Sequence, residues 1–287
     1  MRLTLTIAAA VAALMAPAVP VLTQPAIAQT ADAQWRTVAP ENLLVIDTAK
    51  GRILVELDPR VAPLSVERIR TLADRGFYDG LKFHRVMENF MAQTGDPQGT
   101  GEGGSDLPDV AGEFTFRRGR ADGFTVVVPG APAQFGLIGS IPVSTQPDAQ
   151  MMVTSDFKTS ATALFCPGVA GMARAEGPNS ANSQFFLMTG PRDSLNGQYA
   201  AFGRVVAGMD VVRALKTGPD ARNGAVTDPD VMTRARIASA LPEGERPSVR
   251  VMTTASPAFA ALVEQTRTER GSRFNVCDIQ PPAELVG

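Results

Sequence analysis

Hydrophobic and polar residues alternate along two neighbouring runs, from Leu43 to Asp47 and from Arg52 to Leu57. Lys50-Gly51 separates the runs, so the pattern predicts a β-hairpin. From Pro63 to Tyr78 the apolar positions instead recur at helical spacing. A proline near the start and Gly76 near the end of this stretch predict an amphipathic helix.

Short apolar runs of strand length follow along the rest of the chain. We predict strands at Leu81–Arg85, Asn89–Gln93, Glu113–Arg117, Pro167–Ala173, Gln184–Met188, Ala200–Val206 and Met232–Ser239. A second, short helix is predicted at Met209–Leu215. Many short strands with only two helices favour a mainly β barrel or sandwich over a sheet built from alternating strands and helices.

Two regions differ from this main domain, which we place at residues 41–240. Residues 119–163 are rich in Gly, Pro, Ala, Ser and Thr, and we interpret them as an insertion able to form a hairpin of its own. Residues 241–287 combine a strand pattern, a helix that begins at Ser256-Pro257 and a strand-like run, Phe274–Ile279. They are too few to hold a core alone, so we expect a small α+β extension packed on the main domain.

The start of the chain has the pattern of a secretory signal. Arg2 precedes an apolar, alanine-rich stretch, and Ala26-Ile27-Ala28 offers a small-x-small cleavage site. Three prolines in the stretch argue against an uncleaved spanning helix. We therefore predict a signal peptide at 1–28 and a flexible leader at 29–40. The mature protein would have no membrane span and would be exported, to the periplasm in a bacterium with two membranes.

Composition narrows the chemistry. Lys and Arg number 27 against 29 Asp and Glu, a net charge of −2, and basic residues do not cluster, which argues against a nucleic-acid partner. One histidine and two cysteines are too few for a His/Cys zinc site. We therefore expect neither a metal nor another cofactor.

The candidate site begins at Phe83–Pro97, FHRVMENFMAQTGDP, which sets Arg85 among apolar residues. Downstream, Asn182–Leu187, NSQFFL, again places an amide beside aromatic residues. A fixed cation beside an aromatic-lined hollow suits a neutral, partly apolar ligand that carries a carbonyl group.

Three segments in this order carry a resemblance: FHRVMENFMAQTGDP, GMARAEGPNSANSQFFL and SLNGQYAAFGRVVAGMDVV. Together they resemble the cyclophilin family of peptidyl-prolyl isomerases, with matching segments from Leu43 to Ser239. The resemblance implies a closed eight-stranded antiparallel β-barrel capped by two helices, with a substrate groove on one outer face. It implies isomerisation of X-Pro bonds in unfolded or flexible polypeptides, without a cofactor.

Carried over residue by residue, the resemblance makes Arg85 the catalytic residue. The proline ring would enter a pocket formed by Phe90, Met91, Phe186 and Leu195. The other implied substrate-binding positions are the amides Gln93 and Gln184, the peptide-pairing segment Ala173 and Arg174, and Tyr199. Two of these depart from common family members: Arg174 replaces the more usual asparagine, and Tyr199 stands where many eukaryotic members have histidine.

The reaction asks little of these side chains. Rotation about an X-Pro bond crosses a barrier of about 20 kcal/mol because it breaks amide resonance. In the twisted state the imide nitrogen gains a lone pair, to which a permanently charged guanidinium can donate. No nucleophile, base or metal is needed, so we interpret His84, the only histidine, as structural.

Three further expectations follow. Ser194 stands where cyclosporin-sensitive members carry tryptophan, so we expect weak cyclosporin binding. Cys166 and Cys277 could form a disulfide in an oxidising compartment, and two buried free thiols are the alternative. The competing function is a proline-peptide-binding chaperone or scaffold that keeps the groove without useful turnover.

Overall fold

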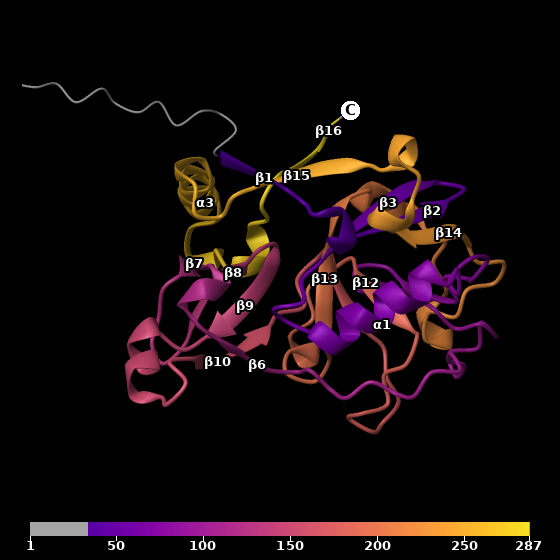
Figure 1. The fold of residues 1–287 in the computed structure, drawn as a ribbon, viewed down its shortest axis with the longest axis horizontal. Helices are drawn as coiled ribbons and strands as arrows, with labels where there is room; N and C mark the ends of the chain where they lie inside the picture. The colour runs from indigo at the N-terminus through magenta and orange to yellow at the C-terminus, as the bar shows by residue number, and fades with distance from the viewer. Residues whose placement is uncertain (1–33, 287) are drawn as a thin grey trace, which may run out of the picture.

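The computed structural model describes residues 34–286, so the predicted signal peptide and residues 29–33 of the leader lie outside the described part. Eight strands form one curled antiparallel sheet in the order β14-β2-β3-β13-β11-β12-β5-β4 (Figure 1). In that order they span Met232–Ile237, Leu43–Thr48, Gly51–Leu57, Ala201–Ala207, Val169–Met172, Phe185–Met188, Met91–Thr94 and Arg85–Met87. The predicted hairpin is confirmed as β2 and β3, paired from Leu43–Glu56 to Thr48–Gly51.

The prediction of a closed barrel is wrong in one respect. The edge strands β14 and β4 are not neighbours in the sheet. Between them lie isolated bridges: Arg85 of β4 with Ala225, and Lys82, before β4, with Val231, before β14. Strand β4 has only three residues, so it offers too short an edge for a continuous ladder.

Helix α1 (Pro63–Asp74) lies against β14 and β13, and the short α2 (Met209–Ala214) lies beside β3. Val66, Ile69 and Leu72 of α1 are fully buried, and each contributes roughly 1.5–3 kcal/mol by leaving water. The helix ends before the predicted Tyr78, because Gly76 takes a left-handed conformation with φ 70°. Whether both helices cap the barrel stays a prediction. Within residues 34–286, helices of the length and apolar character needed to cross a bilayer are absent.

The insertion is larger than the predicted hairpin. It forms a five-stranded antiparallel sheet in the order β6-β10-β9-β8-β7. These strands span Phe116–Arg118, Thr159–Ala163, Ile141–Thr145, Gln134–Ile138 and Phe124–Val128. Leu137, Ile141 and Val143 are fully buried, so the sheet has an apolar face that a lone hairpin could not cover.

The leader and the tail meet in a third sheet, β1-β15-β16. Its strands are Trp35–Thr37, Ser248–Met252 and Ala283–Val286. Residues 35–37 of the predicted flexible leader are therefore a strand, because the open edge of β15 pairs with them from Trp35–Met252 to Thr37–Arg250. Phe274–Ile279 is not the predicted strand: Asn275 there caps a 3-10 turn by accepting from the Cys277 N–H at 2.9 Å.

The remaining helical elements are the 14-residue helix α3 and nine 3-10 turns within the described residues. Helix α3 spans Pro257–Arg270 and begins at the predicted cap, where the Ser256 hydroxyl accepts from the Phe259 N–H. The 3-10 turns are η2 (Pro40–Asn42), η3 (Arg120–Asp122), η4 (Asp148–Val153), η5 (Asp193–Leu195), η6 (Asp220–Arg222), η7 (Ala238–Ala240), η8 (Glu243–Glu245), η9 (Gly271–Arg273) and η10 (Val276–Asp278).

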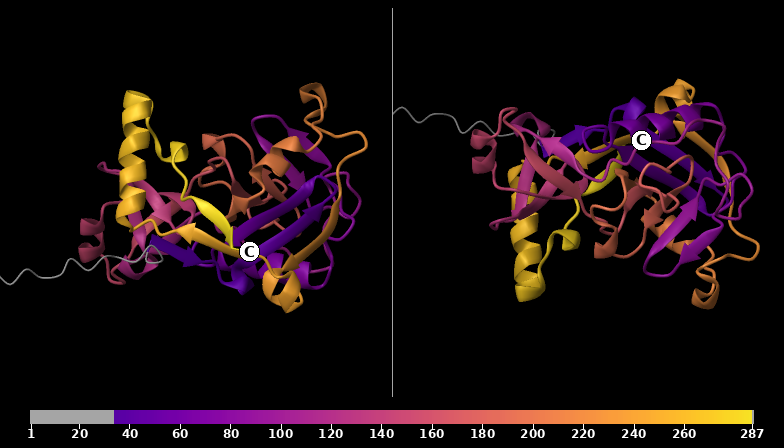
Figure 2. Two further views of the ribbon diagram at one scale, coloured as in Figure 1. Left: turned by 90° about the horizontal axis from the view of Figure 1, so that it is seen from above. Right: turned by 90° about the horizontal axis from the view of Figure 1, so that it is seen from below.

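The tail packs on the insertion as well as on the main domain. Helix α3 stands beside the insertion strands in both views of Figure 2, and its buried Phe259 belongs to the same apolar cluster as Leu137. The Arg267 guanidinium donates to the Val127 carbonyl at 2.7 Å. A disulfide joins Cys166, directly before β11, to Cys277 in the tail. The insertion, the tail and the main domain are therefore held together by apolar packing, a hydrogen bond and a disulfide.

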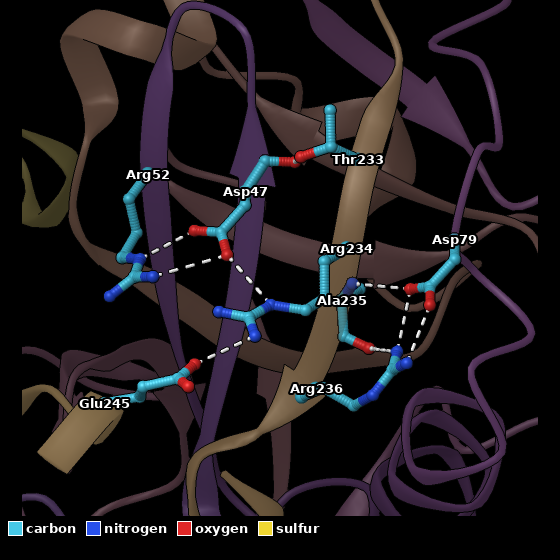
Figure 3. A network of polar contacts seen from close by, with 8 residues as sticks. All are labelled: Asp47, Arg52, Asp79, Thr233, Arg234, Ala235, Arg236 and Glu245. Carbon is cyan, nitrogen blue, oxygen red and sulfur yellow. Dashed lines mark hydrogen bonds and ion pairs between the residues drawn. The ribbon is translucent and has the colours of Figure 1, made fainter. Parts of the chain in front are cut away.

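A polar network holds the edge strand β14 on the outside of the sheet (Figure 3). Asp47 of β2 accepts from Arg52 of β3 at 2.6 Å and from Arg234 of β14 at 3.2 Å. Burial raises the pKa of the Asp47 carboxyl, but the two arginines outweigh it and hold the pKa below its usual value. On the other side of β14, Asp79 accepts from Arg236 at 2.7 Å. The network therefore joins β14 to β2 on one side and to the turn that follows α1 on the other.

Candidate active site

Arg85 is fixed on strand β4 at the wall of a cavity. Its Nε donates to the Asn223 carbonyl at 2.9 Å and its Nη2 to the Asn223 Oδ1 at 2.8 Å. Its Nη1 donates to the Gln93 Oε1 at 3.1 Å, across the β4–β5 pair. All these partners are neutral, so among residues 34–286 no carboxylate offsets the charge. Burial lowers the pKa of the Arg85 guanidinium, which still remains a cation at neutral pH.

Two glutamine amides extend this arrangement. The Gln93 Nε2 donates to the Gln184 Oε1 at 2.9 Å. The Gln184 Nε2 in turn donates to the carbonyls of Gly101 and Gly103, at 2.9 and 2.8 Å. A chain of hydrogen bonds therefore runs from Arg85 through both amides to the glycine-rich loop, and it fixes the direction in which each group points.

The glycine-rich loop is held by Asp96, a fully buried carboxylate. Its oxygens accept from the backbone N–H groups of Gln98, Thr100 and Gly101, at 2.8, 2.7 and 2.6 Å. Burial raises the pKa of Asp96, but these hydrogen bonds outweigh it and keep the pKa below its usual value. The loop edges the cavity at Gly99–Glu102.

The cavity holds about 490 Å³. Its apolar part contains Met91 and Phe186, which are 1% and 5% exposed. The Phe186 ring meets the Tyr199 ring edge-on at 5.9 Å, and Phe165 packs behind both. The predicted site residues that line this cavity are Arg85, Phe90, Met91, Gln93, Ala173, Arg174, Phe186, Leu195 and Tyr199.

Gln184 is the one predicted residue that lies outside the main cavity. It lines an adjoining hollow of about 500 Å³, together with Gly103, Asp109 and Asn182. The hollow and the cavity share Gln93, Ala173 and Arg174, so the two spaces form one continuous groove.

Arg174 forms part of the wall of the groove. Its guanidinium lies 4.6 Å from the Tyr199 ring centroid and 5.4 Å from that of Phe114. Its Nε donates to the Gln198 carbonyl at 2.9 Å. Arg174 therefore braces the Tyr199 ring in the wall of the groove.

His84 lies at the back of the cavity, next to Arg85, and is 7% exposed. Burial lowers the pKa of its imidazole, so the ring is neutral at pH 7. Among the described residues there is also no group of three or more His, Cys, Asp or Glu side chains placed to hold a metal ion. The polar groups of the groove can therefore bind and orient a peptide and donate hydrogen bonds to it.

The sequence analysis did not single out Asn223 and Asp96. Asn223 takes a left-handed conformation with φ 50° and is followed by Gly224, so the Asn-Gly pair was an available turn signal. The insertion contributes no lining residue to the cavity among the described residues.

Comparisons with known proteins agree with this geometry. The family described as "Cyclophilin type peptidyl-prolyl cis-trans isomerase/CLD" matches residues 43–237. A "Probable peptidyl-prolyl cis-trans isomerase" of Brucella suis biovar 1 is 36% identical over 209 residues, which cover 69% of this chain and 83% of that protein. A "Peptidyl-prolyl cis-trans isomerase-like 1" of Emericella nidulans is 32% identical over 172 residues, covering 60% of this chain and 80% of that protein.

A solved structure extends the likeness to the added parts. The crystal structure of cyclophilin AquaCyp293 from Hirschia baltica superposes with a TM-score of 0.80 at 34% identity, covering 89% of this chain and 95% of that one. That coverage reaches beyond the segment that the family description matches. The chain therefore belongs to the cyclophilin-type peptidyl-prolyl cis-trans isomerases.

Proposed function

We propose that this isomerase acts on X-Pro bonds in exported, unfolded or flexible proteins and assists their folding, with Arg85 as the catalytic residue. The observation that carries the catalytic role is the placement of one guanidinium, held by Asn223 and Gln93, at the wall of an apolar cavity. The proline ring enters the cavity between Met91 and Phe186. The polar groove beside it takes the neighbouring backbone.

Catalysis then follows from unequal binding of the planar and the twisted bond. The ring stays fixed in the apolar cavity while the chain on the other side of the bond rotates. As the bond twists, Arg85 donates to the nitrogen lone pair, which the planar ground state does not offer. Asn223 and Gln93 hold the donor in place beforehand, so little reorganisation accompanies the reaction.

The catalytic role is tested in a protease-coupled assay on a short X-Pro peptide. Removal of one preorganised donor costs about 10²- to 10³-fold, so Arg85→Ala should lower kcat/KM by about 10²-fold with an unchanged melting temperature. Arg75→Ala, at the exposed end of α1, removes the same charge and should have no effect. Wild type no faster than background would favour the chaperone or scaffold. Arg85→Ala equal to wild type would exclude this residue.

Export is supported by the signal-like pattern of residues 1–28 and by the Cys166–Cys277 disulfide, a bond typical of oxidising compartments. Intact-mass analysis of protein from the native host should give a chain that begins near Gln29 in the exported fraction. A full-length chain in the cytoplasm would overturn this. For folding assistance, catalytic amounts of enzyme should shorten the proline-limited phase of a refolding test protein, and Arg85→Ala should not.

We also propose weak cyclosporin binding. Ser194 lies in the turn η5 beside Leu195 and supplies no aromatic edge to the groove. Ser194→Trp should strengthen inhibition, with catalysis of short peptides much less affected. Low-nanomolar inhibition of the wild type would refute the proposal.

A further inference from the structure

A second cleft lies beside the isomerase groove and has a volume of about 820 Å³. The insertion, the main domain and the tail each supply part of its wall. The residues that line it are Val128, Phe135, Leu164, Pro167, Pro191, Asp193, Asn196, Arg270, Phe274, Asn275, Val276, Cys277 and Asp278. We propose that this cleft binds apolar side chains of the same polypeptide whose proline occupies the groove.

The chemistry of the cleft sets the class of ligand. Leu164 and Val276 are buried in its wall, and the half-buried rings of Phe135 and Phe274 add apolar surface. Charge is confined to a few residues, and two of them neutralise each other, since Arg270 pairs with Asp278 at 3.1 Å. An apolar interior with a few polar groups around it suits apolar side chains rather than charged ones.

The cleft continues from the isomerase groove across a single turn, η5. Leu195 of that turn lines the proline cavity, whereas Asp193 and Asn196 line the second cleft. Ser194 between them is exposed and small, so the ridge is low. The turn is also fixed, because the Asn196 Oδ1 accepts from the Phe165 N–H at 2.9 Å.

This continuity identifies the occupant. An extended chain advances about 3.3 Å per residue, so a peptide that crosses η5 reaches the cleft within about three to six residues of the proline. Unfolded polypeptides expose the apolar side chains that native proteins bury, and they are the substrates proposed above. Cys277 forms part of the wall, and its disulfide with Cys166 fastens that wall to the segment before β11.

The test compares peptides with one X-Pro core. One series ends near the proline. Two other series carry a Gly-Ser spacer that ends in a dipeptide three to six residues before or after the proline. The dipeptide is Phe-Leu in one series and Ser-Ser in the other. We expect the Phe-Leu extension on one side to lower KM about five- to tenfold at unchanged kcat, and the Ser-Ser extension to have no effect.

Two variants that change the volume of the cleft in opposite directions test whether the lower KM of the Phe-Leu peptides comes from the cleft. Val128→Trp fills the cleft and Phe274→Ser removes part of its wall, and both should abolish the Phe-Leu advantage while short peptides turn over as in wild type. Phe157→Ser is the matched control, because Phe157 is 63% exposed on the insertion but outside the cleft. Melting curves confirm that each variant is folded, and two variants of opposite volume make a shared folding defect easy to recognise.

The proposal rests on the proposed role of the groove, but the two fail differently. In Arg85→Ala, turnover of every peptide should fall by about 10²-fold, yet fluorescence anisotropy should still report tighter binding of the Phe-Leu peptide. An equal KM for the Phe-Leu and Ser-Ser peptides would overturn the cleft proposal, as would an advantage that survives both cleft variants. A wild-type dimer that Val128→Trp converts to a monomer would overturn it too, since a second copy would then be the occupant.

Discussion

The disulfide between Cys166 and Cys277 is the covalent link between main domain and tail, and its removal gives a prediction with a calculable size. The bond closes a loop of 111 residues in sequence. Chain-entropy bookkeeping gives about 5 kcal/mol for a loop of this length, and native disulfides typically contribute about 2–5 kcal/mol. At roughly 2–4 °C per kcal/mol for a chain of this size, reduction should lower Tm by about 4–20 °C.

A comparison of reduced wild type with an alanine variant separates the effect of the cross-link on Tm from the effect of packing around Cys166. Cys166 is completely buried, so Cys166→Ala/Cys277→Ala removes sulfur atoms as well as the bond. Reduced wild type keeps those atoms. The double variant should therefore melt about 2–4 °C below reduced wild type, because deletion of a buried group costs on the order of 1 kcal/mol.

Thermal melts followed by circular dichroism, with and without dithiothreitol, measure both effects. Dithiothreitol should shift the wild type and leave the double variant unchanged, which serves as the control. A wild-type Tm that moves by less than about 2 °C on complete reduction, verified by thiol titration, would refute the entropic reasoning. Phe165 precedes Cys166 and packs behind Phe186, so reduction should also raise KM for short peptides.

Three smaller predictions concern single residues. Burial lowers the pKa of His84, so folding disfavours its protonation. The contribution of neutral His84 to stability is therefore fully present above the unfolded pKa of about 6.5 and is lost as the pH falls below it. The chain has no other histidine, so in His84→Gln the urea midpoint should depend less on pH between pH 5 and 7 than in the wild type. A Cβ on Gly171 would lie 2.7 Å from the buried Phe186 ring, so Gly171→Ala should cost about 1–3 kcal/mol in urea unfolding and raise KM. Ser256→Ala, which removes the cap on Phe259, should cost about 1 kcal/mol by the same assay. An unchanged midpoint in Gly171→Ala or Ser256→Ala would contradict the contact concerned, as would a His84→Gln midpoint that varies with pH as in the wild type.

The sequence was sufficient to predict those elements whose formation depends on residues that are neighbours in the chain. The β2–β3 hairpin, helix α1 and the N-cap of α3 depend on residues close in sequence, and all three were predictable. The pairing of β1 with β15 was not, because Trp35 and Met252 meet across the whole chain. The three-residue edge strand β4 likewise left the sheet open where a closed barrel was expected.

In the candidate site, too, the parts formed by local motifs were predictable, and the parts formed by residues distant in sequence were not. The motif around Arg85 and the one around Gln184 each have a recognisable order of residues, so the cavity could be outlined from the sequence. Asn223, which fixes the guanidinium, comes from a loop 138 residues away. The Asn-Gly pair signals a turn, but nothing in the local sequence shows that the carbonyl and the Oδ1 of Asn223 meet Arg85.

The packing of the tail determines which experiments can reveal what the added parts do. Phe259 of α3 and Leu137 of the insertion share one apolar cluster, and Arg204 of β13 hydrogen-bonds Gln280. Deletion of the tail would therefore expose apolar surface of the insertion and leave the buried Arg204 without its Gln280 partner. A loss of activity in that variant could not be assigned to lost binding, because the variant would also be less stable. Point substitutions on the cleft avoid this, because Val128 and Phe274 are half-exposed at its wall. A change in KM for long peptides alone, at constant Tm, can only come from contacts that the long peptide makes beyond the proline groove.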